Sequence, residues 1–172
     1  MKKKKVLIGI LVMICTLLFA LPVQAKTTDI AKVMNKKVAS AAKSLGLKRD
    51  YRKDKQSRVY SSNGSRLSTL MTFAPKGKYS ASRTYIQGES CYKNNKGRWN
   101  AYINDKKYSI NGVKIGMTTS KAYQKFTRNG WRRVWSGSTH GMYMKGAKAI
   151  SLTLRNGKIT KMNYLWQMES EE

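Results

Sequence analysis

The chain has 172 residues, and its 35 lysines and arginines outnumber eight acids, which gives a formal net charge of +27 at pH 7. A charge this far from neutral favours acidic partners. One histidine, two cysteines and a few scattered acids offer too few ligands for a metal site, and we expect no cofactor. The same shortage argues against an enzyme, including a hydrolase that works with paired carboxylates.

Residues 1–25 have the three parts of a secretory signal peptide. The lysines Lys2–Lys5 precede an apolar run, Val6–Leu21, which a proline ends before the small residues of Val23–Ala25. A retained membrane anchor is the alternative, but a helix of this run spans about 24 Å, short of a hydrocarbon core of roughly 30 Å. We expect cleavage after Ala25, a mature chain that starts at Lys26, and a secreted or wall-associated protein.

Residues 26–168 are expected to form a single basic domain, followed by an acidic tail at residues 169–172. The exported part keeps 31 lysines and arginines and all eight acids, and so carries a charge of +23. Only Cys91 survives cleavage, so no intrachain disulfide can form, and we expect a free thiol without catalytic duty. Cys91 and His140 could make a nucleophile pair, but no recognised motif or orienting acid accompanies them.

The first predicted element is a helix over residues 29–45. Its apolar residues recur at steps of three and four, and Gly46 follows its end. A second helix is predicted between Thr118 or Thr119, which can cap it, and Gly130. The remaining signals predict short antiparallel strands. The expected strands are residues 58–62, 66–73, 79–86, 91–92, 99–103, 108–110, 131–136, 141–145, 149–154 and 159–166.

The last hairpin contains a break in its alternating pattern. Ile159 is out of phase with the apolar residues that follow it up to Trp166. One extra residue in the strand restores the phase, so we predict a β-bulge near Thr160 and Lys161.

The order of elements predicts an α+β fold in which two helices pack on one face of an antiparallel sheet. Residues 28–87 and 110–166 share a helix, a glycine, an apolar residue and a basic pair. The similarity extends to later strands, with Met71–Phe73 matched to Leu152–Leu154. We therefore expect that the two halves are a tandem repeat, with a chance match of two capped helices as the alternative.

Residues 110–118, with the sequence INGVKIGMT, lead into a short helix, Gly130 and strands that end at Lys158–Met162. This pattern resembles the β-lactamase inhibitory protein superfamily and small lipoproteins of outer-membrane assembly. In those proteins a Gly-Met-Thr segment enters a helix that packs on an antiparallel sheet, often as tandem repeats. Residues 129–131, Asn-Gly-Trp, replace the glycine-proline expected after the helix. The resemblance implies a protein-binding or scaffolding role, and no inhibitory residue carries over.

Two rows of cations lie opposite the apolar faces of the predicted helices, with no acid between the lysines of either row. We expect one basic surface that binds an acidic protein or an anionic extracellular polymer. A solvated face without any partner is the alternative. The candidate residues are Lys32, Lys36 and Lys43 on the first helix, Lys121, Lys125 and Arg128 on the second, and Arg132 and Arg133 after it.

Trp131 and Trp135 are candidate aromatic contacts. In a regular strand they share a face with Arg133, although ordinary packing within a sheet is the alternative for both. The sequence predicts an exported, non-catalytic binding module, of a protein-recognition or inhibitor-like kind. The alternative is a binder of an anionic cell-surface polymer or membrane surface, with a cell-wall hydrolase as a distant one. Membrane contact is expected to be peripheral at most, and nucleic acid is not an expected partner.

Overall fold

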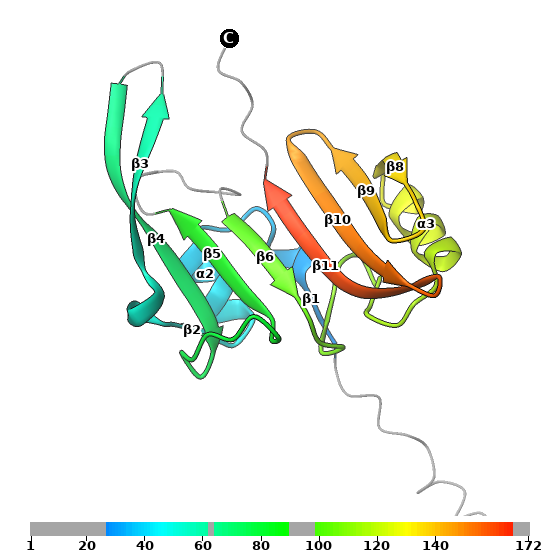
Figure 1. The fold of residues 1–172 in the computed structure, drawn as a ribbon, viewed down its shortest axis with the longest axis horizontal. Coiled ribbons are helices and arrows are strands. Elements are labelled where there is room, and N and C mark those ends of the chain that lie inside the picture. The colour runs from blue at the N-terminus through cyan, green and yellow to red at the C-terminus, as the bar shows by residue number, and fades with distance from the viewer. Residues whose placement is uncertain (1–26, 62–63, 90–98, 167–172) are drawn as a thin grey trace, which may run out of the picture.

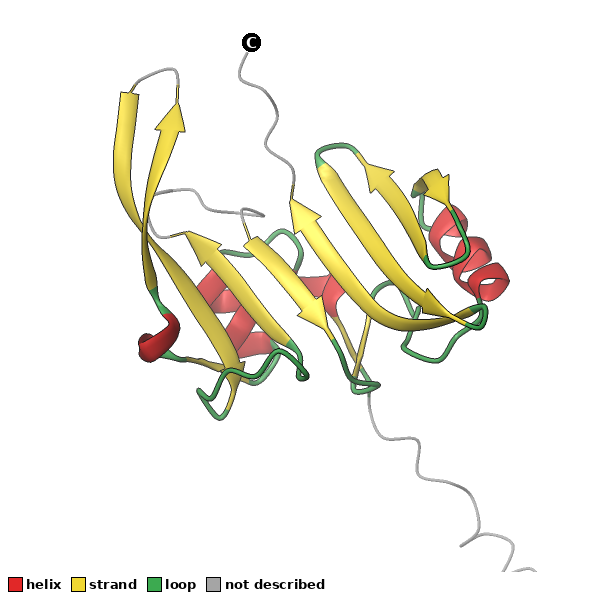
Figure 2. Cartoon of the chain, in the orientation of Figure 1, coloured by secondary structure: helices red, strands yellow, loops and turns green. Residues whose placement is uncertain are grey.

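A nine-stranded antiparallel sheet dominates the computed structural model, which describes residues 27–61, 64–89 and 99–166 (Figure 1, Figure 2). The predicted α+β class with antiparallel strands is confirmed. The elements are β1 (Thr28–Asp29), η1 (Ile30–Val33), α2 (Val38–Ser44), β2 (Leu47–Arg49), η2 (Tyr51–Lys53), β3 (Lys55–Ser61), β4 (Gly64–Pro75), β5 (Tyr85–Glu89), β6 (Trp99–Ile103), β7 (Tyr108–Ser109), α3 (Thr119–Arg128), β8 (Arg132–Ser136), β9 (His140–Lys145), β10 (Lys148–Arg155) and β11 (Lys158–Trp166).

The sheet order runs β2-β4-β5-β6-β11-β10-β9-β8, and β3 pairs with β4 outside this path. Each half therefore starts at an outer strand and proceeds towards the centre, where β6 pairs antiparallel with β11. β1 and β7 form a separate parallel pair beside the sheet. Every strand of the large sheet thus pairs with neighbours from its own half except at the central β6–β11 contact.

Both helices contact the same face of this sheet. A Cβ built on Gly88 of β5 would lie 2.6 Å from a methyl of Val38 in α2. On α3, the ring centroid of Phe126 lies 4.7 Å from that of Tyr143 in β9. Cross-strand neighbours point to one side, and the register connects the two contacts through Gly88–Trp99, Ala101–Tyr164, Tyr164–Ile150 and Ile150–Tyr143. We call this side the helix side and the other the open face, which Figure 1 views directly.

The prediction of one continuous helix over residues 29–45 is wrong. Asp29 caps the short 3-10 helix η1 through the amide of Ala31, and α2 starts only at Val38. The indole of Trp99 donates a 3.0 Å hydrogen bond to the carbonyl of Lys36, which a continuous helix would need for its own next turn. The apolar residues on either side of the break are still buried, as the spacing predicted: Ile30, Val33, Met34, Val38, Ala41, Ala42 and Leu45.

The strand predicted over residues 79–86 is also too long, because β5 begins only at Tyr85. The amide of Tyr79 donates to the carboxylate of Asp50, and the side-chain amide of Asn104 donates to the carbonyls of Ala81 and Arg83. The Tyr79 amide and these two carbonyls would pair with a neighbouring strand if residues 79–84 were part of β5, but they are hydrogen-bonded within turns instead. Residues 47–57, between the first predicted helix and the first predicted strand, contain β2, η2 and the start of β3. The strand at residues 91–92 lies outside the described residues.

The bulge predicted in the last hairpin is confirmed. Leu154 pairs with Ile159 and Thr153 pairs with Lys161, so Thr160 is the extra residue. The Thr160 hydroxyl donates a 3.1 Å hydrogen bond to the carbonyl of Thr153. The bulge returns Ile159 to the helix side, where it is 1% exposed.

One hydrophobic core runs beneath the sheet from the first half to the second. It includes Ile30 and Val38 at one end, the central Tyr164, and Phe126 and Leu154 at the other. No helix among the described residues is long and apolar enough to cross a membrane.

Candidate binding surfaces

All eight predicted cations are exposed, and all but one of them lie on the same side of the sheet. Arg132 is the exception, because it pairs with Met144 on the open face, whereas its neighbour Arg133 pairs with Tyr143 on the helix side. Successive residues of a strand point to opposite faces, which separates the two arginines. The other seven lie on the helix side: Lys32, Lys36, Lys43, Lys121, Lys125, Arg128 and Arg133.

Two lysines that the sequence reasoning missed connect the two helical regions. Lys148 Nζ donates to Asn35 Oδ1, just before α2, and Lys145 Nζ donates a 2.8 Å hydrogen bond to the carbonyl of Asn129, at the end of α3. Burial, followed by the charge of Lys145, lowers the pKa of Lys148. Strand alternation could have found Lys148, because it is in phase with the buried Ile150. We call Lys145 and Lys148 the basic bridge.

The second half of the sheet has no counter-charge of its own. Residues 106–168 contain thirteen lysines and arginines and no aspartate or glutamate. The two salt bridges among the described residues are Arg49–Asp54, at 2.7 Å, and Arg52–Asp50, at 3.0 Å. Both lie beside β2 in the first half, so no described cation of the second half is neutralised by a carboxylate.

A continuous row of side chains crosses the open face. The row contains Tyr85 of β5, Tyr102 of β6, Asn163 of β11, Ser151 of β10, Met142 of β9 and Trp135 of β8, each the direct cross-strand neighbour of the next. The rings of Tyr85 and Tyr102 stack at 4.4 Å, and Tyr79 meets the Tyr85 ring edge-on at 4.8 Å. Trp135, at the other end, is 52% exposed. We call these six residues the open-face row.

The prediction that Trp131, Arg133 and Trp135 share one face is wrong. The pairing of β8 with β9 shifts between Arg133 and Trp135, so Val134 is an extra residue and the two side chains lie on opposite faces. Trp131 is only 4% exposed, and its indole donates a 2.9 Å hydrogen bond to the side chain of Asn111. Trp131 is therefore a core residue, and Trp135 is the aromatic contact that stays available.

His140 is exposed on the open face, where its ring centroid lies 6.3 Å from that of Trp135. Its Nδ1 is 3.0 Å from the hydroxyl of Thr139, and no described carboxylate contacts the ring. Cys91, the predicted free thiol, lies outside the described residues. Within the part of the chain that the structure describes, no three histidines, cysteines or acids come together as metal ligands.

No family model, no curated protein and no solved structure matches this chain. The open-face row and the basic helix side are therefore the two features from which a function can be argued.

Proposed function

We propose that this chain is an exported, non-catalytic recognition module that binds an acidic protein through its open face. The open-face row is the observation that carries the proposal. It crosses six neighbouring strands, which corresponds to a span of about 24 Å at the usual strand spacing. Both of its ends are aromatic, and the two α-helices, α2 and α3, pack against the opposite face.

The composition of the row supports a protein as the partner. Tyrosine, tryptophan and methionine are enriched in the centres of protein–protein interfaces, and Tyr102, Met142 and Trp135 supply all three. The tyrosine cluster is already ordered, because the Tyr85 ring stacks on Tyr102 and meets Tyr79 edge-on. Ordered aromatic side chains lose little conformational entropy on binding, which favours affinity.

The charges around the row support an acidic partner. Arg132 is the cross-strand neighbour of Met144, and Lys161 is the neighbour of Thr153, so both flank the row on the open face. The acid Glu89 lies on β5 near the Tyr85 end of the row, as the cross-strand neighbour of Leu70 and away from these two cations. Cations at the rim of an interface accelerate association with an acidic partner and disfavour basic ones.

We also propose that the two halves are repeats of one unit, a helix followed by four strands. The sheet order supports this, because α2 precedes β2, β4, β5 and β6 as α3 precedes β8, β9, β10 and β11. In this alignment β4 corresponds to β9, whereas the sequence matched Met71–Phe73 of β4 with Leu152–Leu154 of β10.

Capture experiments test the open face. The purified protein, immobilised, is exposed to the secreted and wall fractions of the producing organism and washed at low and high salt. We expect Trp135→Ala and Tyr102→Ala to reduce capture of an acidic protein by about tenfold each, because they remove contacts at the row. Tyr51→Ala is the matched control, since Tyr51 is an exposed aromatic residue outside the open-face row. Equal capture by all three variants and the wild type would reject the open face as the binding surface.

An anionic polymer or membrane surface is the second candidate, and the basic bridge favours it for the helix side. Retention on anionic wall polymer or anionic liposomes is measured for a variant with Lys125, Arg128, Lys145 and Lys148 replaced by Gln. The control replaces Lys48, Lys55, Lys78 and Arg83, four exposed cations of the first half, and so removes the same charge while leaving the helix side of the second half intact. Polymer binding predicts a steep loss with salt and a larger loss in the first variant. Equal losses in the two variants would show attraction by net charge alone.

A further inference from the structure

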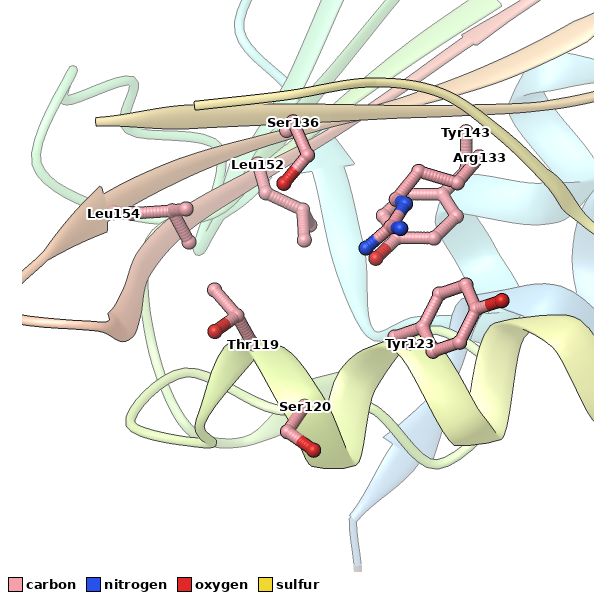
Figure 3. A pocket seen from close by; sticks show the side chains of 9 residues that line it. Thr119, Ser120, Tyr123, Arg133, Ser136, Tyr143, Leu152 and Leu154 are labelled. Carbon is pink, nitrogen blue, oxygen red and sulfur yellow. The ribbon is translucent and has the colours of Figure 1, made fainter. Parts of the chain in front are cut away.

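A cavity of about 280 Å³ lies between the first turns of α3 and strands β8, β9 and β10 on the helix side (Figure 3). Small residues leave this space open. Thr119 occupies the helix position that faces the sheet one turn before Tyr123, and Gly141 has no side chain at its helix-side position in β9. Phe126 closes one end of the site by packing on Tyr143.

Two polar groups in the cavity have no anionic or hydrogen-bonding partner. The Arg133 guanidinium lies 4.4 Å above the ring centroid of Tyr123, and no described carboxylate pairs with it. Tyr143 is 3% exposed, yet its hydroxyl makes no hydrogen bond with any described residue. Figure 3 shows the guanidinium and this hydroxyl side by side, with the Tyr123 ring facing them from α3. Stacking on Tyr123 orders the guanidinium and leaves its N–H groups free to bind a ligand.

The opposite wall of the cavity is apolar. Leu152 and Leu154 of β10 line it, and Figure 3 shows their side chains pointing towards the space above Thr119. A ligand that fits must therefore be anionic at the Arg133 end and hydrocarbon at the Leu154 end. The volume is near the lower limit of ordinary ligand sites, which restricts the ligand to a small molecule or a single terminal residue.

We propose that this cavity binds a small monocarboxylate with a short hydrocarbon group. The two parallel N–H donors of a guanidinium match the two oxygens of a carboxylate, and the Tyr143 hydroxyl supplies a third donor. The hydrocarbon group packs against Leu152 and Leu154. A free short-chain acid and the C-terminal residue of a peptide both present this chemistry. The site is separate from the open-face row, so its test does not depend on the proposed function.

Titration of the purified protein with isocaproate, followed by calorimetry and by NMR chemical shifts, tests the site. We expect a dissociation constant on the order of 1 mM, with shifts at the cavity residues. Glycyl-glycyl-leucine and its C-terminal amide distinguish the two sources, because tighter binding of the free peptide than of isocaproate would indicate a peptide terminus. The uncharged analogue isocaproamide should bind at least tenfold more weakly than isocaproate.

A pair of adjacent arginines provides the matched variants. Arg133→Gln should weaken isocaproate at least tenfold, whereas Arg132→Gln, which removes the same charge from the open face, should leave its binding within twofold. Tyr143→Phe should weaken it about threefold. Gly141→Val should block the cavity, with the fold checked by circular dichroism. The proposal is overturned if no carboxylate binds, if both arginine variants act equally, if isocaproamide binds as well as isocaproate, or if inorganic phosphate binds more tightly through Arg133.

Discussion

The two halves of the sheet have similar element orders, but their cations are stabilised differently: by carboxylates in the first half and without carboxylates in the second. In the first half, Asp50 and Asp54 each pair with an arginine and also accept backbone hydrogen bonds from Tyr79 and Thr72. In the second half, which has no acid, Lys145 donates to a helix-end carbonyl and Arg133 stacks on Tyr123. Both halves share one core. Ion pairs are thus dispensable for this architecture, and the unpaired cations of the second half are free to bind anions.

Phe126→Ala should have the largest effect, because it tests whether the acid-free half is held by its core. Phe126 is fully buried and contacts Tyr143 and Trp131. Truncating a buried phenylalanine costs about 3–5 kcal/mol. Urea denaturation followed by tryptophan fluorescence and by circular dichroism should show one transition at lower urea, since the core is continuous. Two separate transitions would show that the halves unfold independently.

Asp29→Ala should cost about 2 kcal/mol, because it removes a connection between the halves. The Asp29 carboxylate accepts hydrogen bonds from the amides of Ala31, Asn111 and Gly112 at 2.9–3.0 Å. The variant leaves these donors without a partner. Asp105→Ala, which removes an acid that accepts from the nearby Lys107 amide, is the control. Equal urea midpoints for the two variants would contradict a specific role for Asp29.

Lowering the pH should destabilise the first half through Asp50, by less than either substitution above. A hydrogen bond from Arg52, followed by one from the Tyr79 amide, lowers the pKa of Asp50 from 3.8 to about 2. Because the folded pKa lies below the unfolded one, Asp50 contributes its stabilisation fully above pH 3.8 and loses it as the pH falls towards 2. Asp50→Asn should flatten the urea midpoint against pH in this window. If the urea midpoint of the variant falls with pH as it does in the wild type, Asp50 is not the source of the acid-dependent loss of stability.

Lys148→Gln should have the smallest effect, within about 0.5 kcal/mol at neutral pH. The variant loses the contact with Asn35 but also loses the repulsion from Lys145. Burial lowers the pKa of Lys148, so the folded wild type should gain a little stability as the pH rises towards 10.5, and the variant should not. Thermal unfolding in this pH range measures the difference. A large loss at neutral pH would make the basic bridge a structural element.

Local patterns made much of this fold predictable. The apolar phase around Ile159 predicted the bulge near Thr160 and Lys161, which lies at Thr160, and the helix cap was predicted as Thr118 or Thr119, of which Thr118 is the cap. The break in the first helix was not predictable in this way. It depends on Trp99, which lies 63 residues from Lys36 in the sequence and takes its carbonyl.

The candidate sites were predictable in their chemistry more than in their geometry. Seven of the eight cations lie on the helix side, but Arg133 lies there because of its position in β8, and Lys36 lies between η1 and α2 rather than in a helix. The separation of Arg133 from Trp135 arises because β8 and β9 shift register at Val134, and such a shift depends on the partner strand. The cavity beside Arg133 needs α3 and three strands of the second half together, so no single segment indicates it.

The position of β11 has a consequence for how the chain folds as it is made. β11 is the last strand in the sequence, yet it lies at the centre of the sheet against β6. The two outer meanders can form from local contacts, but the centre stays open until residues 158–166 are available. Sheets closed by such distant segments fold slowly. For the proposed export, this delay would keep the chain unfolded until residues 158–166 have been made.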